Sequence, residues 1–332
     1  MIDLQGKKVL LIAPSFFNYD KEIKRKLEER GASVVLFDDR PSNNSIVKGI
    51  IRINSNIIKP VIEKYYKNII ESTKSSDFDI IFFTKGESIT VKALKLLKDS
   101  FPKAKLVLYL WDSVSNNKNP KIFSYFDRIL SFDNNDCKKY GGFIFRPLFY
   151  LDYFKEIGKE NLTDFTFDLS FIGTVHSDRY FIIKNILKSL SESKYSTYIV
   201  MYLPSKMLFW YRKLTEKQFR KVPYSDIEFN PVPFAKVTEC FRESKAIIDI
   251  QHPGQTGLTM RCIEALGAKK KLITTNRSII DYDFYDKDNI CVIERDEHPN
   301  IDFLKTNYKN VSDDIYYKYS IDGWIDDCLN NI

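Results

Sequence analysis

Residues suited to holding a phosphate group lie in a loop between a strand-like run and a helix-like run. The apolar run Lys245–Ile250 predicts a buried strand, and the apolar periodicity from Gly257 onward predicts a helix. Gly254 and Gly257 have no Cβ, so the backbone of this loop can approach a ligand closely. Helix N-termini attract phosphate because their first amides lack intrahelical partners. The sequence therefore predicts that the amides of Gln255–Leu258 hold a diphosphate.

Side chains in and beside the predicted helix could bind the rest of such a ligand. Glu264 lies about seven residues from the helix start, roughly 10 Å along the axis, which matches the reach from a pyrophosphate to a ribose. Arg261 lies on the same side of the helix and could hold Glu264 or meet a phosphate oxygen. Thr256 could cap the helix, and His252 is a candidate contact residue. The simpler alternatives are a Glu264–Arg261 pair on a solvated helix face and ordinary turn-forming roles for the glycines.

The segment Phe171–Arg179 is a second strand-like run that leads through a glycine into a helix start. Gly173 and Thr174 would line the same site, because parallel strands end at one edge of their sheet. Arg179 would point at a phosphate from the first helical turn, and a surface helix position is its simpler alternative. Both segments therefore predict one anion site in the second half of the chain.

Carboxylates that follow predicted strands in the first half of the chain could act as a general base. Glu87 and Asp112 each come just after a buried apolar run, where a side chain reaches the carboxyl edge of a sheet. Trp111 offers a ring that could stack on a ligand, and Lys85 places a positive charge near Glu87. Asp133 is a third candidate. Each carboxylate has the simpler alternative of a turn or helix-capping role.

The first half of the chain alternates strand-like and helix-like segments. Buried strands are predicted at Lys7–Pro14, Ser33–Asp39, Asp79–Lys85, Lys105–Trp111 and Arg128–Phe132. Helices are predicted at Asp20–Arg30, Asn56–Ser72 and Ser88–Leu97. This alternation is typical of a mostly parallel sheet with helices on both faces, in which functional loops follow the strands.

The same alternation restarts after a polar stretch at Lys155–Thr166. Strands are predicted at Asp168–Thr174, Tyr195–Tyr202, Lys245–Ile250 and Lys270–Asn276, with helices from Ser177 and at Phe234–Glu243. The last patterned segment, Asp313–Asn331, predicts a helix that packs back across the domain junction. We therefore predict two doubly wound Rossmann-like domains at residues 1–155 and 156–310, followed by a returning helix within residues 311–332.

The composition fits a folded protein of two domains, with 332 residues of which 44% are hydrophobic and 29% charged. No apolar run approaches the roughly 20 residues that span a bilayer, and the first residues show no cleavable signal, so we expect a cytoplasmic protein. Five scattered cysteines fit a reducing compartment, and three histidines without ligand spacing predict no metal site. The net charge of +7 suits binding to diphosphates or to an anionic membrane surface. No zinc-finger, RNP or GXXG signature indicates binding to nucleic acid.

The segment Leu203–Val222 combines basic residues with large apolar ones. Its six Lys and Arg residues stand against Glu216 alone and alternate with the apolar residues Met207, Leu208, Phe209, Trp210 and Leu214. Such a segment could lie on an anionic membrane. The alternative is an amphipathic helix whose apolar face meets the core and whose basic face is solvated.

The stretch Asp249–Asn276, which reads DIQHPGQTGLTMRCIEALGAKKKLITTN, resembles the donor-site segment of GT-B glycosyltransferases. It is most similar to the group 1 and CgeB-like enzymes of bacterial capsule and lipopolysaccharide synthesis. The similarity includes Glu264 followed by Ala-Leu-Gly and a strand that ends in Thr-Asn. By this resemblance Glu264 binds the ribose, and the loop before the helix covers the sugar and phosphates. Many retaining members carry two glutamates eight positions apart. The second corresponds to Glu264, and at the position of the first this chain has Thr256.

The resemblance implies a GT-B fold, with two Rossmann-like domains facing a cleft, and transfer of a sugar from a UDP- or GDP-linked donor. The acceptor would be a growing surface polysaccharide of the capsule or lipopolysaccharide type, free or lipid-linked, and Thr256 favours an inverting mechanism. Neither a metal nor another cofactor is expected, because this family stabilises the diphosphate with helix N-termini and basic side chains. The alternatives are a GT-B-like polyol-phosphate transferase and a non-catalytic nucleotide- or glycan-binding protein. A further expectation is peripheral contact with the inner face of the cell membrane through residues 203–222.

Overall fold

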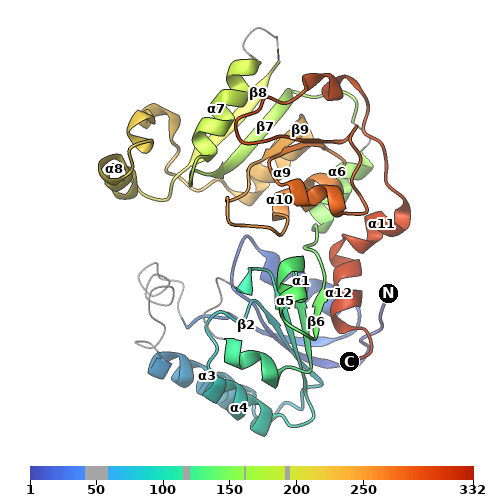
Figure 1. The fold of residues 1–332 in the computed structure, drawn as a ribbon. Helices are drawn as coiled ribbons and strands as arrows, with labels where there is room; N and C mark the ends of the chain where they lie inside the picture. Colours follow the sequence, from blue (N-terminus) through green and yellow to red (C-terminus); the bar gives the residue numbers. More distant parts are fainter. Residues whose placement is uncertain (42–58, 115–119, 161, 191–194) are drawn as a thin grey trace. The chain divides into compact units, whose positions relative to one another are not determined.

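The computed structural model describes residues 1–41, 59–114, 120–160, 162–190 and 195–332. These residues form two compact units, each with a parallel sheet of its own (Figure 1). Unit 1 comprises Met1–Leu148 and Ile321–Ile332, and unit 2 comprises Phe149–Ser320. The predicted class, two α/β Rossmann-like domains, is therefore confirmed.

Unit 1 contains a six-stranded sheet in the order β2-β1-β3-β4-β5-β6, with every neighbouring pair parallel. Its strands are β1 (Lys8–Ile12), β2 (Ser33–Phe37), β3 (Ile80–Thr84), β4 (Lys105–Leu110), β5 (Arg128–Ser131) and β6 (Phe143–Phe145). Its helices are α1 (Tyr19–Glu29), α3 (Lys59–Thr73), α4 (Val91–Ser100), η3 (Pro120–Tyr125), α5 (Asn134–Lys139) and α12 (Ile321–Leu329). The strand order reverses between β1 and β3, and doubly wound sheets bind ligands at such a switch point.

Both faces of this sheet are buried, which explains why its strands are nearly continuous apolar runs. β3 reads IIFFT, and all five of its residues are buried. Successive side chains point to opposite faces. Phe83 therefore packs in the core that includes α3 and α4, whereas Phe82 meets Trp324 of α12 with ring centroids 5.5 Å apart. Trp324 is fully buried, so a residue from the far end of the sequence helps to fill the core on the opposite face of the sheet.

Ion pairs also hold α12 in unit 1. Arg30, just after α1, pairs with Asp322 at 3.1 Å and with Asp326 at 2.6 Å. Arg146 pairs with Asp327 at 2.7 Å. All three acids lie on α12, so this helix is fastened to unit 1 by both charge and packing.

The C-terminal segment is two helices, not the single helix predicted for Asp313–Asn331. α11 (Asp313–Lys318) belongs to unit 2 and α12 to unit 1. Between them, Tyr319 O accepts a hydrogen bond from Tyr150 N at 2.9 Å, and Ser320 forms a parallel β-bridge with Tyr150. This strand-like pairing interrupts the helix.

The chain enters unit 2 at Phe149, before the polar stretch at which we placed the boundary. α6 (Asp152–Lys159) belongs to unit 2, because Phe154 is fully buried against Phe241 of α9 (Phe234–Glu243), with ring centroids 4.9 Å apart. Residues 162–164 of the polar stretch are an exposed surface loop of this unit.

Unit 2 contains a five-stranded parallel sheet in the order β11-β10-β9-β7-β8. Its strands are β7 (Phe167–Thr174), β8 (Thr197–Tyr202), β9 (Ser244–Asp249), β10 (Lys271–Thr274) and β11 (Ile290–Val292). Its other helices are α7 (Arg179–Ser189), α8 (Lys206–Thr215), η4 (Phe219–Lys221), η5 (Tyr224–Asp226), α10 (Met260–Gly267), η6 (Arg277–Asp281) and η7 (Ile301–Lys305). The order reverses between β7 and β9, which makes their carboxyl ends the switch point of this sheet.

Most predicted strands and helices are present with small shifts at their ends. The short strands β6 and β11 were not predicted. The segment 203–222 forms the shorter helix α8 and the turn η4 instead of one helix. The predicted helix at Asn56–Ser72 corresponds to α3, and its first residues, 56–58, lie outside the described ranges.

Candidate functional site

The two segments predicted to hold an anion meet at the switch point of unit 2. β7 and β9 are neighbouring parallel strands, so the loops after them start from one edge of the sheet. His176 follows β7 and His252 follows β9, and their ring centroids lie 5.4 Å apart. The fold therefore brings both motifs to the same place.

Arg179, the first residue of α7, ties these two segments together. Its Nε donates to Ile250 O at 2.8 Å, its Nη2 donates to the same oxygen, and its Nη1 donates to Thr174 O at 2.8 Å. These hydrogen-bond partners are all main-chain carbonyls. Burial, with further contributions from Arg261 and Arg295, lowers the pKa of Arg179 to about 10, so it remains charged at neutral pH. A half-buried charge with such partners is stabilised further by an anion.

Gly173 has no side chain, and this leaves room for the guanidinium of Arg179. A Cβ at position 173 would lie 2.6 Å from Phe171 Cζ and 3.3 Å from Arg179 Nη1. Phe171 is buried, so a larger residue would displace either the ring or the guanidinium. Thr174 is exposed at the same edge, where its carbonyl accepts from Arg179.

The packing around Gly254, unlike that around Gly173, does not explain why the residue is a glycine. A Cβ there would meet only His252 Nδ1 within 4 Å, at 3.7 Å. Its φ is outside the left-handed region that favours glycine. Neither turn geometry nor packing therefore requires glycine at this position, which favours the interpretation that it leaves space for a ligand.

The helix after the loop begins later than predicted. α10 starts at Met260, and its N-cap is Thr259, whose side chain accepts from Cys262 N at 3.4 Å. Thr259 Oγ1 in turn donates to Asp249 Oδ1 at 2.9 Å, so the end of β9 fixes where the helix starts. The prediction that Thr256 caps this helix is therefore wrong.

The loop Gln255–Leu258 precedes the helix and has hydrogen bonds of its own. Gln255 N donates to His252 O at 2.9 Å, and the Asn276 side chain donates to Gly257 O at 3.2 Å. Of the four amides predicted to hold a diphosphate, that of Gln255 is thus already bonded within the loop.

Glu264 and Arg261 form a pair inside unit 2. Glu264 is only 7% exposed, and its Oε2 lies 3.9 Å from Arg261 Nε. Arg261 Nη1 also donates to Ile172 O of β7 at 2.6 Å, so it fastens α10 to the sheet. The alternative of a solvated helix face is therefore wrong. Because α10 starts at Met260, Glu264 lies roughly 6 Å along the axis, and the predicted 10 Å is too long.

Arg295 is a residue of this edge that the sequence did not reveal. It follows β11, and its Nη1 pairs with Asp178 Oδ1 at 2.6 Å while its Nη2 donates to Gln251 O at 2.7 Å. β11 has three residues, too few to show strand periodicity. Only the contacts with Asp178 and Gln251 identify the arginine as part of the site.

This edge of the sheet gathers three arginines, and three carboxylates, Asp178, Asp249 and Glu264, lie beside them. Arg179, Arg261 and Arg295 come from three different elements, and each donates to a carbonyl in or just after β7 or β9. Burial, followed by the proximity of Arg179 and His252, lowers the pKa of His176 to about 4, so it is neutral at neutral pH. The positive charge of the site is therefore carried by arginines, and one guanidinium can bind two phosphate oxygens at the same time.

In unit 1 the two leading candidates for a general base lie beside each other. Lys85 Nζ is 3.1 Å from Glu87 Oε2 and 3.4 Å from Asp112 Oδ2. Glu87 also pairs with Arg40 at 3.0 Å. The side chain of Asp112 is 41% exposed and that of Glu87 only 15%, so Asp112 is the more accessible carboxylate. Lys85 has a φ of 108°, a strained conformation of the kind found at functional sites.

Asp133 has the capping role that was its simpler alternative. Its side chain accepts from Asn135 N at 2.9 Å at the start of α5, and the residue is 3% exposed. We therefore set it aside as a base. Trp111, beside Asp112, is half-buried.

Two aromatic residues that were not predicted follow β1 at the switch point of unit 1. Phe16 and Phe17 are both about half exposed, and their rings meet edge to face with centroids 4.6 Å apart. Exposed aromatic rings at such a position can stack on a ligand ring. They were missed because one short apolar pair after a strand has no periodicity.

Asp39 is a buried carboxylate that holds the main chain at Glu87, just after β3. It is fully buried, and it accepts from Glu87 N at 2.9 Å and from Tyr66 Oη at 3.2 Å. Burial raises the pKa of Asp39 to about 6. In the folded protein Asp39 therefore holds its proton to a higher pH than in the unfolded chain.

Asp39→Asn is expected to remove a pH dependence of stability. The raised pKa means that the contribution of Asp39 to stability is complete below about pH 4 and is lost as the pH rises through 6. The rise of the Asp39 pKa from 3.8 to about 6 corresponds to at most about 3 kcal/mol of unfolding free energy. Calorimetric unfolding should show the variant gaining stability relative to the wild type by up to that amount between pH 4 and pH 7. A constant difference over this range would contradict the assignment.

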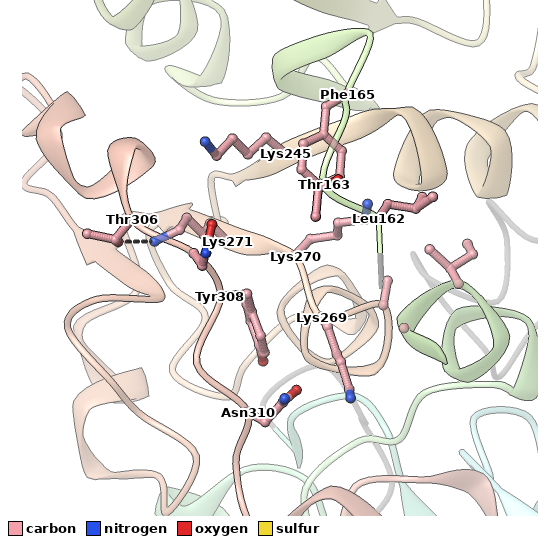
Figure 2. Close-up of a pocket in the computed structure, with 14 residues that line it drawn as sticks. Leu162, Thr163, Phe165, Lys245, Lys269, Lys270, Lys271, Thr306, Tyr308 and Asn310 are labelled. Carbon is pink, nitrogen blue, oxygen red and sulfur yellow. Dashed lines mark hydrogen bonds between the residues drawn. The ribbon is translucent and has the colours of Figure 1, made fainter. Parts of the chain in front are cut away.

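A concavity of unit 2, with a volume of about 230 Å³, lies at the opposite edge of the sheet, by the amino ends of β9 and β10. It is lined by four lysines, Lys245, Lys269, Lys270 and Lys271, whose ammonium groups point in different directions (Figure 2). Lys271 donates to Phe303 O and to Thr306 Oγ1, both at 2.7 Å, and Lys270 donates to Arg242 O at 3.0 Å. These two lysines join chain segments and do not converge on a ligand.

No helix within the described ranges is both long enough and apolar enough to cross a lipid bilayer. In the same part of the chain, no three His, Cys, Asp or Glu side chains are grouped so as to hold a metal ion.

Several solved structures that resemble this chain are glycosyltransferases. A glycosyltransferase from Rickettsia africae superposes with a TM-score of 0.59 at 15% identity, over 98% of this chain and 99% of that one. HepE from Anabaena, solved with UDP and glucose, gives 0.56 at 12% identity, over 98% and 100%. An alpha-glucosyltransferase solved with UDP and DNA gives 0.55 at 14% identity, over 86% and 81%. No protein-family model matches the sequence, and no curated protein matches it significantly.

At these identities the likeness shows the fold, which is the GT-B fold of two Rossmann-like domains. The two Rossmann-like domains implied by the sequence resemblance are thereby confirmed.

Proposed function

We propose that this protein transfers a sugar from a nucleotide-sugar donor to a hydroxyl group of a glycan acceptor. The observation that carries the proposal is Arg179 at the switch point of unit 2. A guanidinium has five N–H donors, and Arg179 uses three of them on carbonyls at the ends of β7 and β9. Its charge and its other donors suit the diphosphate of such a donor.

In this proposal the diphosphate lies between Arg179 and Gly254, and Glu264 binds the ribose. Arg261 orients Glu264, and Arg295, which is paired with Asp178, holds the loop after β9 through Gln251 O. Basic side chains stabilise the departing diphosphate, so the reaction as proposed needs no metal. UDP is our first choice of nucleotide, before GDP, because two of the similar structures contain UDP.

We propose Asp112 as the general base that removes the proton of the acceptor hydroxyl. It follows β4, and it is more exposed than Glu87, which lies between two cations. A base in unit 1 and the absence of a carboxylate at Thr256 support an inverting mechanism.

The acceptor in this proposal is a surface polysaccharide of the capsule or lipopolysaccharide type, extended in the cytoplasm. The aromatic pair Phe16 and Phe17 at the switch point of unit 1 offers a stacking surface for its sugar rings. A polyol-phosphate transferase and a non-catalytic nucleotide-binding protein are the alternatives that the experiments below distinguish.

The test of the donor site compares UDP with its 2′-deoxy analogue by calorimetry. A buried carboxylate that accepts from both ribose hydroxyls makes the wild type prefer UDP by roughly tenfold or more, because hydrogen bonds to charged groups contribute about 1.5–3 kcal/mol. Glu264→Gln keeps the shape and should lose most of this preference while still binding both nucleotides.

Each outcome has a separate meaning. If the wild type binds none of UDP, GDP and CMP, the donor site is wrong and the proposed function fails with it. If UDP binds but the deoxy analogue binds equally well, only the role of Glu264 fails. UDP binding without turnover of any UDP-sugar would favour the non-catalytic alternative.

A further inference from the structure

Helix α8 presents a large apolar face to solvent. Met207, Trp210, Tyr211 and Leu214 are 81%, 57%, 61% and 75% exposed. Their spacing of three, four and seven residues from Met207 places them on one side of the helix. The alternative considered for this segment, an apolar face toward the core and a basic face toward solvent, does not account for these four residues.

The helix is nevertheless firmly attached to unit 2 by its other side. Phe209 is fully buried, with ring centroids 5.4 Å from Phe219 and 5.3 Å from Tyr224. Arg212 is also buried, and its Nη1 donates to Val175 O at 2.6 Å. The apolar face is thus exposed on a fixed helix, not on a loosely held segment.

Positive charge surrounds the exposed face. The range from Lys206 to Lys221 contains six Lys or Arg residues and one acid, a net charge of +5. The acid, Glu216, pairs with Arg212 at 2.7 Å. Among the basic residues, Lys206, Lys217, Arg220 and Lys221 are exposed. An occupant of this face must therefore be both apolar and negatively charged.

We propose that α8 docks unit 2 onto the surface of a bilayer that contains anionic phospholipids. Trp and Tyr favour the boundary between headgroups and acyl chains, where Leu and Met side chains can also be buried. Lysines and arginines beside them attract anionic headgroups. Figure 1 shows α8 projecting from unit 2 beyond the end of β8.

The docking surface is linked to the proposed donor site. Val175, whose carbonyl accepts from Arg212, lies between Thr174 and His176 at the carboxyl end of β7. α8 itself follows β8, which ends at the same edge of the sheet. Docking therefore holds this edge near the membrane, which suits an acceptor carried on a membrane lipid. This last consequence rests on the proposed function, whereas the docking itself does not.

The test is co-sedimentation with vesicles of phosphatidylcholine, with and without phosphatidylglycerol. We expect the wild type to bind the anionic vesicles and to bind pure phosphatidylcholine weakly. Trp210→Ser combined with Leu214→Ser, and separately Lys217→Glu combined with Lys221→Glu, should each lower binding at least about tenfold. All four positions are exposed, so the fold is retained.

Matched controls change exposed residues elsewhere on unit 2. Ile280→Ser, at a position 45% exposed, and Lys305→Glu should leave vesicle binding unchanged. Equal binding by the wild type and the Trp210/Leu214 variant would overturn the proposal. So would light scattering that shows a dimer dispersed by these same substitutions, because the face would then be covered by a second copy.

UDP calorimetry on the same variants separates this inference from the proposed function. The Trp210/Leu214 variant should bind UDP as the wild type does. A wild type that binds vesicles but no nucleotide would disprove the donor site and leave the docking surface intact.

Discussion

Arg179→Ala is expected to weaken the binding of UDP by about 100-fold or more. The change removes a half-buried guanidinium from the place where β7 and β9 end, together with the charge-assisted hydrogen bonds that we propose it donates to the diphosphate. Two such bonds contribute about 3 kcal/mol or more, and each 1.4 kcal/mol corresponds to a factor of ten. Calorimetric titration of the purified variant with UDP measures the effect directly.

The matched control is Arg277→Ala, which removes an arginine that is 71% exposed and paired with Glu294 on the same unit. It should leave UDP affinity unchanged. Because Arg179 also bonds Ile250 O and Thr174 O, Arg179→Lys is the second variant. It keeps the charge but not the planar geometry and should recover only part of the affinity. Unchanged binding by a folded Arg179→Ala protein would remove the main support for the proposed function.

Asp112→Asn is expected to lower kcat by about 10²- to 10⁴-fold, the usual contribution of a general base. The affinity for UDP should stay the same, because unit 2 binds the nucleotide in this proposal. The measurement is turnover of a UDP-sugar with an acceptor, together with the affinity for UDP.

Glu87→Gln is the comparison that decides between the two candidates. Glu87 is held by ion pairs with Lys85 and Arg40, so removal of its charge should disturb the turn. We expect kcat to fall less than it does in Asp112→Asn. Asp77→Asn, at a side chain 75% exposed, is the control for a surface carboxylate. If Glu87→Gln abolishes turnover while Asp112→Asn retains it, Glu87 is the base and the assignment to Asp112 is wrong.

The sequence predicted the fold well because the sheets are parallel and buried on both faces. Strands such as β3, with the run IIFFT, are continuous apolar segments that a periodicity argument recognises. β6 and β11 have three residues each, so they show no pattern and depend on their neighbours in the sheet. The break between α11 and α12 depends on a contact with Tyr150, which no local pattern encodes.

The site was predicted in outline, but its details depend on tertiary contacts. The segments around Arg179 and Gly254 were identified from glycines and strand ends, which are local features. The start of α10 was misplaced because Thr259 caps it through a contact with Asp249. The burial of Glu264 could not be predicted either, because it depends on how α10 is fastened to the sheet by the hydrogen bond from Arg261 to β7.

Gly267 shows that part of the recognised motif has a packing origin. It is the glycine of the Ala-Leu-Gly run after Glu264. A Cβ at this position would lie 2.4 Å from Cγ of Tyr150. The glycine therefore allows α10 to pack against Tyr150, independently of any ligand. A sequence resemblance in this segment thus combines residues that shape the unit with residues proposed to bind the donor.

The returning helix α12 has a consequence for how the chain is made. Unit 1 needs Trp324 to fill its core and Asp322 to pair with Arg30. Unit 2 is a continuous segment, Phe149–Ser320, which precedes these residues. During synthesis on the ribosome, unit 2 is therefore complete before unit 1. The N-terminal sheet must wait with part of one face uncovered until Ile321–Ile332 emerges, so the usual order of N-terminal domains folding first is reversed.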